Sequence, residues 1–183
     1  PDFEGAKFVC SPPLRPAWHA EHLWKGLAAG DLQTVATDHC PFDFRGQKDA
    51  GLTDFRKIPN GLPAIETRLM LVHQGVNDGH ISFNRFVDLV STTPAKLFGL
   101  YPKKGLLAPG ADADVVLWNP RREMDLSVAK LHMRVDYSPY EGRKVFGGPD
   151  KVFSRGRLIV DKDRFVGEAG AGRFVPRARF SQP

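Results

Sequence analysis

The chain of 183 residues is 42% hydrophobic and 26% charged, a globular composition that excludes a disordered or collagen-like protein. Its net charge of +5 is concentrated near the C-terminus, because residues 151–183 hold eight basic and three acidic side chains whereas residues 1–150 hold eighteen of each. A nucleic-acid-binding surface needs cations around its reading element. The distribution therefore argues against nucleic acid as a partner and favours a basic arm that packs on a neighbouring protein.

The apolar runs, the start of the chain and the cysteines indicate the cellular location. No run approaches the roughly 18 consecutive apolar residues of a membrane span, so we predict no membrane association. The chain starts at Pro1 with neither an initiator methionine nor a signal peptide, so we expect a piece of a longer protein. Cys10 and Cys40 are too few for a disulfide framework and favour a cytoplasmic location.

The first hundred residues alternate between predicted strands and helices. Residues 7–10 and 33–37 are short β-prone runs, each followed by a loop that contains proline. Apolar spacing and capping residues predict helices over residues 17–29, 64–74, 83–90 and 94–98, the first stopped by Gly30 and the last two capped by Ser82 and Thr93. Such alternation is typical of an α/β fold with a parallel sheet.

After Gly105 short strands separated by turns replace the helices. The run at residues 115–118 predicts a strand, and residues 151–160 predict a tight hairpin that turns at Arg155-Gly156. From residue 161 the chain is rich in glycine and arginine with scattered aromatic residues, which is typical of an arm. We therefore divide the chain into three parts, residues 1–104, 105–160 and 161–183.

Asp38 is the strongest local candidate for chemistry, since it directly follows the predicted strand at residues 33–37. In barrel enzymes the C-terminal ends of the strands carry the catalytic groups. An aspartate at that place can bind a metal ion and exchange protons with a reacting group. A turn or a helix cap explains the same position equally simply, and the position alone does not separate these interpretations.

The six histidines give no complete metal site by spacing, because the chain holds neither a His-x-His nor a His-Glu-x-x-His motif. His19 and His22 share a helix face, but their tryptophan neighbours favour a partly buried amphipathic helix. We predict that His73 and His80 are surface residues. Cys40 has no recognisable base partner, which favours a structural thiol.

A longer motif is Val35-Ala36-Thr37-Asp38-His39-Cys40-Pro41-Phe42-Asp43-Phe44, which continues through Gly46-Gln47-Lys48 to Lys57-Ile58-Pro59-Asn60-Gly61. Further segments follow the same order along the chain, at residues 9–15, 84–89, 93–96, 110–116 and 136–142. Together they closely resemble the dihydropyrimidinases and hydantoinases, which are cyclic amidohydrolases. The resemblance covers nearly the whole chain and is far more specific than any single motif.

The resemblance implies a fold and an activity. Residues 1–104 would be the last βα units of a (β/α)8 TIM-type barrel of a metal-dependent hydrolase, residues 105–160 strands of a small β-sandwich module, and residues 161–183 a C-terminal arm. The implied reaction opens dihydrouracil, dihydrothymine or hydantoin rings to N-carbamoyl amino acids, with two Zn²⁺ ions per full-length subunit, as in pyrimidine degradation. The arm would join copies of the subunit into a homo-oligomer, a dimer or a tetramer.

The resemblance also assigns site residues. Asp38 would be a metal ligand and the catalytic proton shuttle, and Ser11 and Asn60 would bind the substrate, largely through their main chain. The family's other ligands would precede residue 1, so we expect this chain alone to be inactive. A helix cap for Ser11 and a Pro-Asn-Gly turn for Asn60 are the alternative interpretations.

Two hypotheses other than a hydrolase stay open at this point. Collapsin response mediator proteins resemble the same enzymes but are non-catalytic cytosolic scaffolds. They lack the aspartate at the position of Asp38 and differ at that of Asn60, whereas this chain keeps both residues, which favours the hydrolase. The chain could alternatively serve only in assembly or dimerisation.

Overall fold

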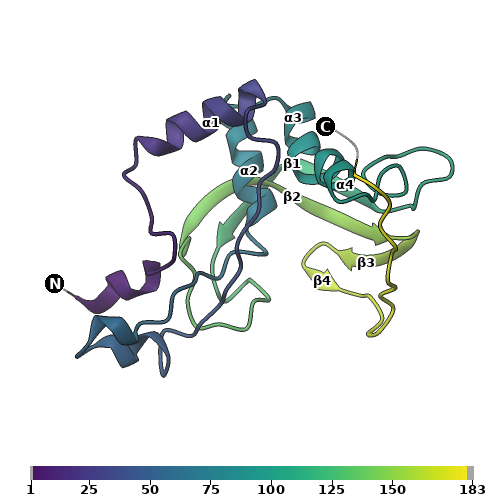
Figure 1. Ribbon diagram of the computed structural model, residues 1–183. Helices are drawn as coiled ribbons and strands as arrows, with labels where there is room; N and C mark the ends of the chain where they lie inside the picture. Colours follow the sequence, from purple (N-terminus) through teal and green to yellow (C-terminus); the bar gives the residue numbers. More distant parts are fainter. Residues whose placement is uncertain (1, 181–183) are drawn as a thin grey trace.

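A computed structural model describes residues 2–180, in which short helices accompany a four-stranded antiparallel sheet (Figure 1). The α-helices are α1 (His19–Ala29), α2 (Arg68–Asn77), α3 (Phe83–Val87) and α4 (Thr93–Leu97). The 3-10 helices are η1 (Phe3–Phe8), η2 (Lys48–Gly51) and η3 (Phe55–Lys57), and the segment η4 (Asp88–Thr92) is π-helical. The strands are β1 (Val115–Leu126), β2 (Arg143–Ser154), β3 (Arg157–Asp161) and β4 (Arg164–Phe165). No helix within residues 2–180 is long and apolar enough to cross a bilayer.

Local capping chemistry sets several helix ends as predicted. Helix α1 ends at Gly30, which has the left-handed φ of 91° that glycine adopts without strain. Ser82 caps α3, because its Oγ accepts a hydrogen bond from the Arg85 amide at 3.1 Å. The prediction that Thr93 caps a separate helix is wrong. Thr93 is helical, and α3, η4 and α4 follow one another without a break.

The predicted strand at residues 7–10 is also wrong, because η1 occupies Phe3–Phe8 and residues 9–10 are irregular. Residues 33–37 belong to no strand in the described part of the chain. A strand is defined by its ladder of hydrogen bonds with a neighbour. The one pairing near this run is an isolated parallel bridge between His39 and Leu62.

The sheet follows the order β1-β2-β3-β4, and each strand pairs antiparallel with the next strand along the chain. Arg155 and Gly156 both have positive φ, 47° and 76°, as a type I′ hairpin turn requires, which confirms the predicted hairpin. Strand β1 runs well beyond the predicted residues 115–118. It continues past Pro120 because the register with β2 shifts between Asn119 and Glu123, a bulge of the kind that accommodates proline in a sheet.

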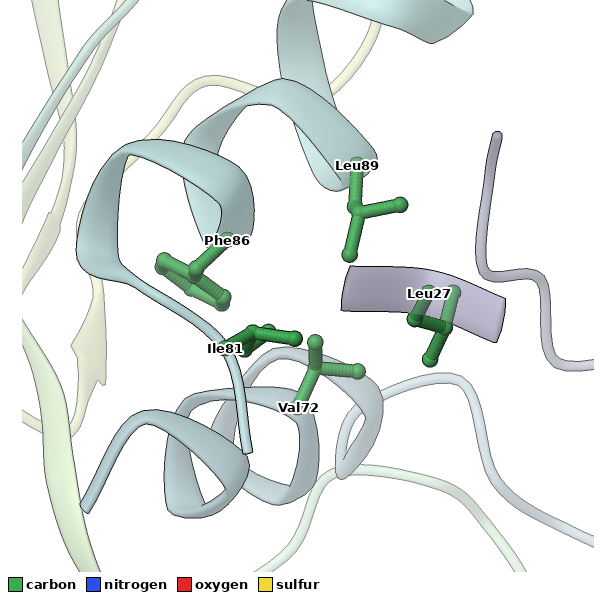
Figure 2. Packing of buried hydrophobic residues seen from close by; sticks show 5 residues of the cluster. All are labelled: Leu27, Val72, Ile81, Phe86 and Leu89. Atoms are coloured by element: carbon green, nitrogen blue, oxygen red, sulfur yellow. The ribbon is translucent and has the colours of Figure 1, made fainter. Parts of the chain in front are cut away.

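The core joins the helices to the sheet. One cluster comes from α1, α2, the following turn, α3 and η4, and consists of Leu27, Val72, Ile81, Phe86 and Leu89 (Figure 2). A second cluster joins α2 to the sheet through Met70, Leu126 and Val145. Trp118 of β1 packs against both clusters, so they form one continuous apolar interior.

Polar contacts align α2 with β2. His73 is buried, and its Nδ1 lies 2.9 Å from the carbonyl oxygen of Phe146, which also accepts a hydrogen bond from Asn77 at 2.8 Å. Gly147 lies so close to the His73 ring that a Cβ would be 2.2 Å from Nδ1. The prediction of a surface position is therefore wrong for His73. It holds for His80, which is exposed and stacks on Trp24.

The C-terminal segment runs back from β4 towards α4 (Figure 1). The Ala178 amide donates a hydrogen bond to the Gly99 carbonyl at 2.8 Å. Phe174 and Phe180 on this segment are 90% and 72% exposed. Residue 1 and residues 181–183, which belong to the first and third predicted parts, lie outside the described residues.

Candidate functional site

The loop that carries Asp38 lies directly beside the segment that carries Asn60. His39 and Leu62 form a parallel bridge, and the Cys40 amide donates a hydrogen bond to the Leu62 carbonyl at 3.2 Å. The approach is close enough that a Cβ on Gly61 would lie 2.3 Å from the Cys40 carbonyl oxygen. The glycine of the Pro-Asn-Gly motif is thus required for contact between the two segments.

Asp38 has an unusual backbone conformation. Its φ is 46°, a left-handed value that L-residues seldom adopt and that aspartate tolerates better than most. Such conformations persist where the surroundings enforce them and cluster at functional sites. The residue is exposed, so its carboxylate faces solvent beside the loop.

His39 fixes the loop and is not itself a metal ligand candidate. Its Nδ1 accepts hydrogen bonds from the amides of Ala64 and Ile65, at 3.1 and 3.3 Å. Because Nδ1 accepts, these contacts assign the proton of the neutral ring to Nε2. No ring nitrogen then offers a free lone pair, which leaves Asp38 as the ligand candidate of this motif.

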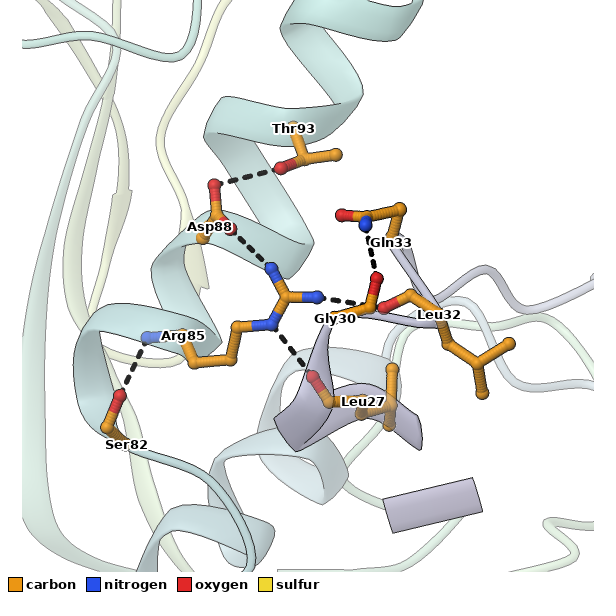
Figure 3. A network of polar contacts seen from close by, with 8 residues as sticks. All are labelled: Leu27, Gly30, Leu32, Gln33, Ser82, Arg85, Asp88 and Thr93. Atoms are coloured by element: carbon orange, nitrogen blue, oxygen red, sulfur yellow. Dashed lines mark hydrogen bonds and ion pairs between the residues drawn. The ribbon is translucent and has the colours of Figure 1, made fainter. Parts of the chain in front are cut away.

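Two arginines hold the chain between the end of α1 and Asp38, where no strand ladder forms. Arg68 of α2 donates from Nη1 to the Val35 carbonyl at 2.7 Å. Arg85 of α3 donates to the carbonyls of Leu27 and Leu32 at 2.8 and 2.9 Å, as Figure 3 shows. Asp88 holds the Arg85 guanidinium at 2.5 Å and in turn accepts a hydrogen bond from the Thr93 hydroxyl.

Lys48 connects the two segments that carry Ser11 and Asn60. Its side chain is fully buried, and Nζ donates hydrogen bonds to the carbonyls of Val9 at 3.1 Å and Pro59 at 2.9 Å. The Val9 carbonyl also accepts a hydrogen bond from the Gly61 amide at 3.1 Å. Burial lowers the pKa of Lys48, and the nearby thiols of Cys10 and Cys40 act in the opposite direction.

Asp136 attaches the remaining part of the long loop. Its carboxylate accepts hydrogen bonds from the amides of Phe44 at 2.6 Å and Arg45 at 3.0 Å, and its own amide donates to Asp43. Burial raises the pKa of Asp136, but the amide hydrogen bonds outweigh it and hold the pKa below its ordinary value. Next to it, burial raises the pKa of Tyr137 to about 12, so this phenol is neutral.

The three predicted site residues therefore lie on three neighbouring segments, 9–11, 38–40 and 59–62, and all three side chains are exposed. The arrangement does not amount to a metal site. Within residues 2–180 no group of three or more histidine, cysteine, aspartate or glutamate side chains could hold a metal ion. Asp38 has the right chemistry for one oxygen ligand of a zinc ion, but the described residues supply no full ligand set.

Lys48, Asp136 and Arg85 were not predicted as supports of the site. These side chains bind main-chain carbonyls and amides. Every residue carries such groups, so the order of side chains along the chain does not indicate which of them will be bound. The one available signal was that all three lie within the segments of the motif resemblance.

Comparison with known proteins is consistent with this geometry. The model of the amidohydrolase family matches residues 6–159. The chain belongs to this family, and within it to the hydantoinase and dihydropyrimidinase group. The match assigns the chain to part of a TIM-barrel-type fold with α/β content, as the sequence predicted.

Individual relatives are similar over almost the whole chain. The D-hydantoinase of Streptomyces coelicolor is 53% identical over 178 residues, which are 97% of this chain and 38% of the relative. The solved structure of D-hydantoinase from Bacillus sp. AR9 has a TM-score of 0.96 at 54% identity, covering 100% of this chain and 40% of that one. Dihydropyrimidinase from Brevibacillus agri gives the same TM-score, identity and coverage. The chain thus spans about 40% of the length of these relatives.

Proposed function

We propose that the protein to which this chain contributes hydrolyses cyclic ureides. The substrates would be 5,6-dihydropyrimidines or hydantoins, and the products N-carbamoyl amino acids. The single observation that carries the proposal is the junction of the segments bearing Ser11, Asp38 and Asn60, in a chain that is 51–54% identical to several D-hydantoinases. A non-catalytic scaffold would not need an exposed carboxylate held in a left-handed conformation beside these segments.

The reaction adds water to a ring carbonyl and breaks the adjacent C–N bond. The Asp38 carboxylate would accept a proton from the attacking water and return it to the departing ring nitrogen. A general base must lie within hydrogen-bond reach of that proton. The exposed position of Asp38, on a backbone fixed by the neighbouring His39 contacts, suits this role.

A metal ion would assist this chemistry. We propose Zn²⁺, two ions per full-length subunit, with Asp38 as one ligand and the other ligands outside the described residues. Bound zinc lowers the pKa of a water molecule and polarises a carbonyl group. The carboxylate would then combine a ligand role with its proton transfers.

The ring itself would be held by main-chain groups of Ser11 and Asn60. A cyclic ureide alternates N–H donors and C=O acceptors, which backbone amides and carbonyls complement. A hydrogen bond from the Gly61 amide to the Val9 carbonyl brings the two segments next to each other. Ring recognition would therefore depend on backbone positions and little on the identity of the exposed side chains.

Three further features belong to this proposal. The sheet β1–β4 would be part of a β-sandwich module over residues 105–160, followed by an arm over residues 161–183. The exposed Phe174 and Phe180 and the excess of basic residues favour contact of the arm with a second copy of the subunit. The oligomer would be a dimer or tetramer in the cytoplasm.

The proposed function is tested on the full-length protein. Purified protein is supplied with zinc and incubated with 5,6-dihydrouracil and, separately, with hydantoin, and the N-carbamoyl products are separated by chromatography. We expect ring opening that stops when a chelator removes the metal and returns when zinc is restored. A zinc-loaded protein that forms no product from either ring would contradict the hydrolase and favour the scaffold.

A further inference from the structure

Lys48 has no role in the proposed chemistry, yet its side chain lies in an environment that is energetically unfavourable for a lysine. Its side chain is fully buried inside a loop-rich region, where the charged form of an amine is disfavoured. Lysines that merely cover apolar surface keep their ammonium group in water. Here the head group points inward and donates to two carbonyls that are fifty residues apart in sequence.

The two carbonyls that Lys48 binds lie close in sequence to the proposed substrate-binding residues. Pro59 directly precedes Asn60, and Val9 lies two residues before Ser11. We propose that Lys48 is a positioning residue that sets the spacing between the two substrate-binding segments and thereby the affinity for the ring. This inference rests on the proposed function, which it extends to a residue that touches no substrate.

The backbone of Lys48 is itself held in place. Its amide donates to the Asp43 carbonyl at 3.1 Å, and the Asp43 amide donates to the side chain of Gln47 at 2.5 Å. The Asp136 carboxylate accepts hydrogen bonds from the amides of Phe44 and Arg45 in the same loop. The backbone of Lys48 is therefore held in place, and its side chain holds the segments of Ser11 and Asn60 through two hydrogen bonds.

The kinetic signature of Lys48 should differ from that of Asp38. Main-chain hydrogen bonds to an intact ring form in the ground state and persist in the transition state, so their loss weakens binding in both. Such a loss raises KM and leaves kcat nearly unchanged. A group that moves protons during the reaction acts on kcat instead.

The test compares Lys48→Met with Lys57→Met in the full-length, zinc-loaded protein, because Lys57 is an exposed lysine of the same loop region. For 5,6-dihydrouracil, we expect Lys48→Met to raise KM about tenfold, the effect of one lost hydrogen bond, with kcat within about threefold of wild type. Amide hydrogen exchange should become faster in residues 9–12 and 58–62. Lys57→Met should leave KM and exchange unchanged.

Unchanged KM or unchanged exchange in Lys48→Met would overturn the proposal, as would equal effects of the two substitutions. If Lys48→Met does not fold, Lys48→Gln replaces it, since its shorter amide cannot reach both carbonyls and should show the same pattern. Hydrogen exchange also separates two failures. A wild-type protein that opens no ring would contradict the proposed function, whereas unaltered exchange in residues 9–12 and 58–62 would contradict the role of Lys48.

Discussion

The sheet and the loop region of this chain are held together in different ways. Strands β1 to β4 satisfy one another's backbone groups along regular ladders, with turns that their own residues specify. The segments around Asp38, Ser11 and Asn60 have almost no ladder. Single buried or half-buried side chains, such as Lys48 and Arg68, bind carbonyls of these segments instead. A sheet spreads its stability over many equivalent bonds, whereas these loops depend on a small number of individual contacts.

This difference suits a candidate active site. Loops can place groups at angles that a regular sheet forbids, as the left-handed Asp38 illustrates. In return, substitution of one supporting side chain should disturb the loops far more than an equivalent change in the sheet. The following predictions concern the loop region and the helical core beside it, from the largest expected effect to the smallest.

Replacing Asp38 with asparagine should have the largest effect on activity. Asparagine is nearly isosteric but cannot accept and return a proton, so we expect kcat to fall about 10²–10⁴-fold. Steady-state kinetics on 5,6-dihydrouracil measure this loss. The matched control is Asp31→Asn, an exposed aspartate after α1, which should retain wild-type rates. Equal rates for Asp38→Asn and wild type would refute the role of Asp38.

Leu89→Ala should have the largest effect on stability in the helical half of the core. Leu89 is fully buried in the cluster of Figure 2, and truncation of such a leucine costs about 2–5 kcal/mol of unfolding free energy. Urea denaturation of the full-length protein measures the change. Val87→Ala on the same helical stretch, where the side chain is 40% exposed, should cost less than about 1 kcal/mol. Similar costs for the two variants would contradict the assigned core.

Asp136→Asn should have a small, pH-dependent effect. The folded-state pKa of Asp136 is depressed, so its ionised form stabilises the protein above the unfolded pKa of about 3.9, and this contribution is lost as the pH falls through the folded value. Because the carboxylate is exposed, we expect a difference of at most about 1 kcal/mol at neutral pH. Urea unfolding at pH 7 and at stepwise lower pH values should show the difference shrink below about pH 4. A difference that is constant through the acid range would contradict the amide contacts of Asp136.

Features specified by short stretches of sequence were predictable. Gly30, Ser82 and Arg155-Gly156 each fix a helix end or a turn through their own conformational preferences, and all three predictions are confirmed. The errors concern tertiary context. Residues 7–10 are β-prone but form no strand, and His73 is buried because β2 covers it.

The sequence predicts the residues of the candidate site that would contact the substrate or the metal. It does not predict the side chains that hold the surrounding loops in place. The family resemblance rests on motifs that contain Asp38, Ser11 and Asn60. The roles of these three residues stay predictions. Lys48 acts on carbonyls that are 39 and 11 residues away, so neither its spacing nor its neighbours signal the contact. Such side-chain-to-backbone bonds become visible only when the chain is folded.

The central claim is that residues 9–12, 38–41 and 59–62 form one ring-binding site. The most direct measurement is amide hydrogen exchange on the full-length, zinc-loaded protein, with and without saturating N-carbamoyl-β-alanine, the product expected from dihydrouracil. The account predicts that all three segments become protected together while β2 and β3 do not change. Protection that omits these segments, or that appears in the sheet alone, would contradict it.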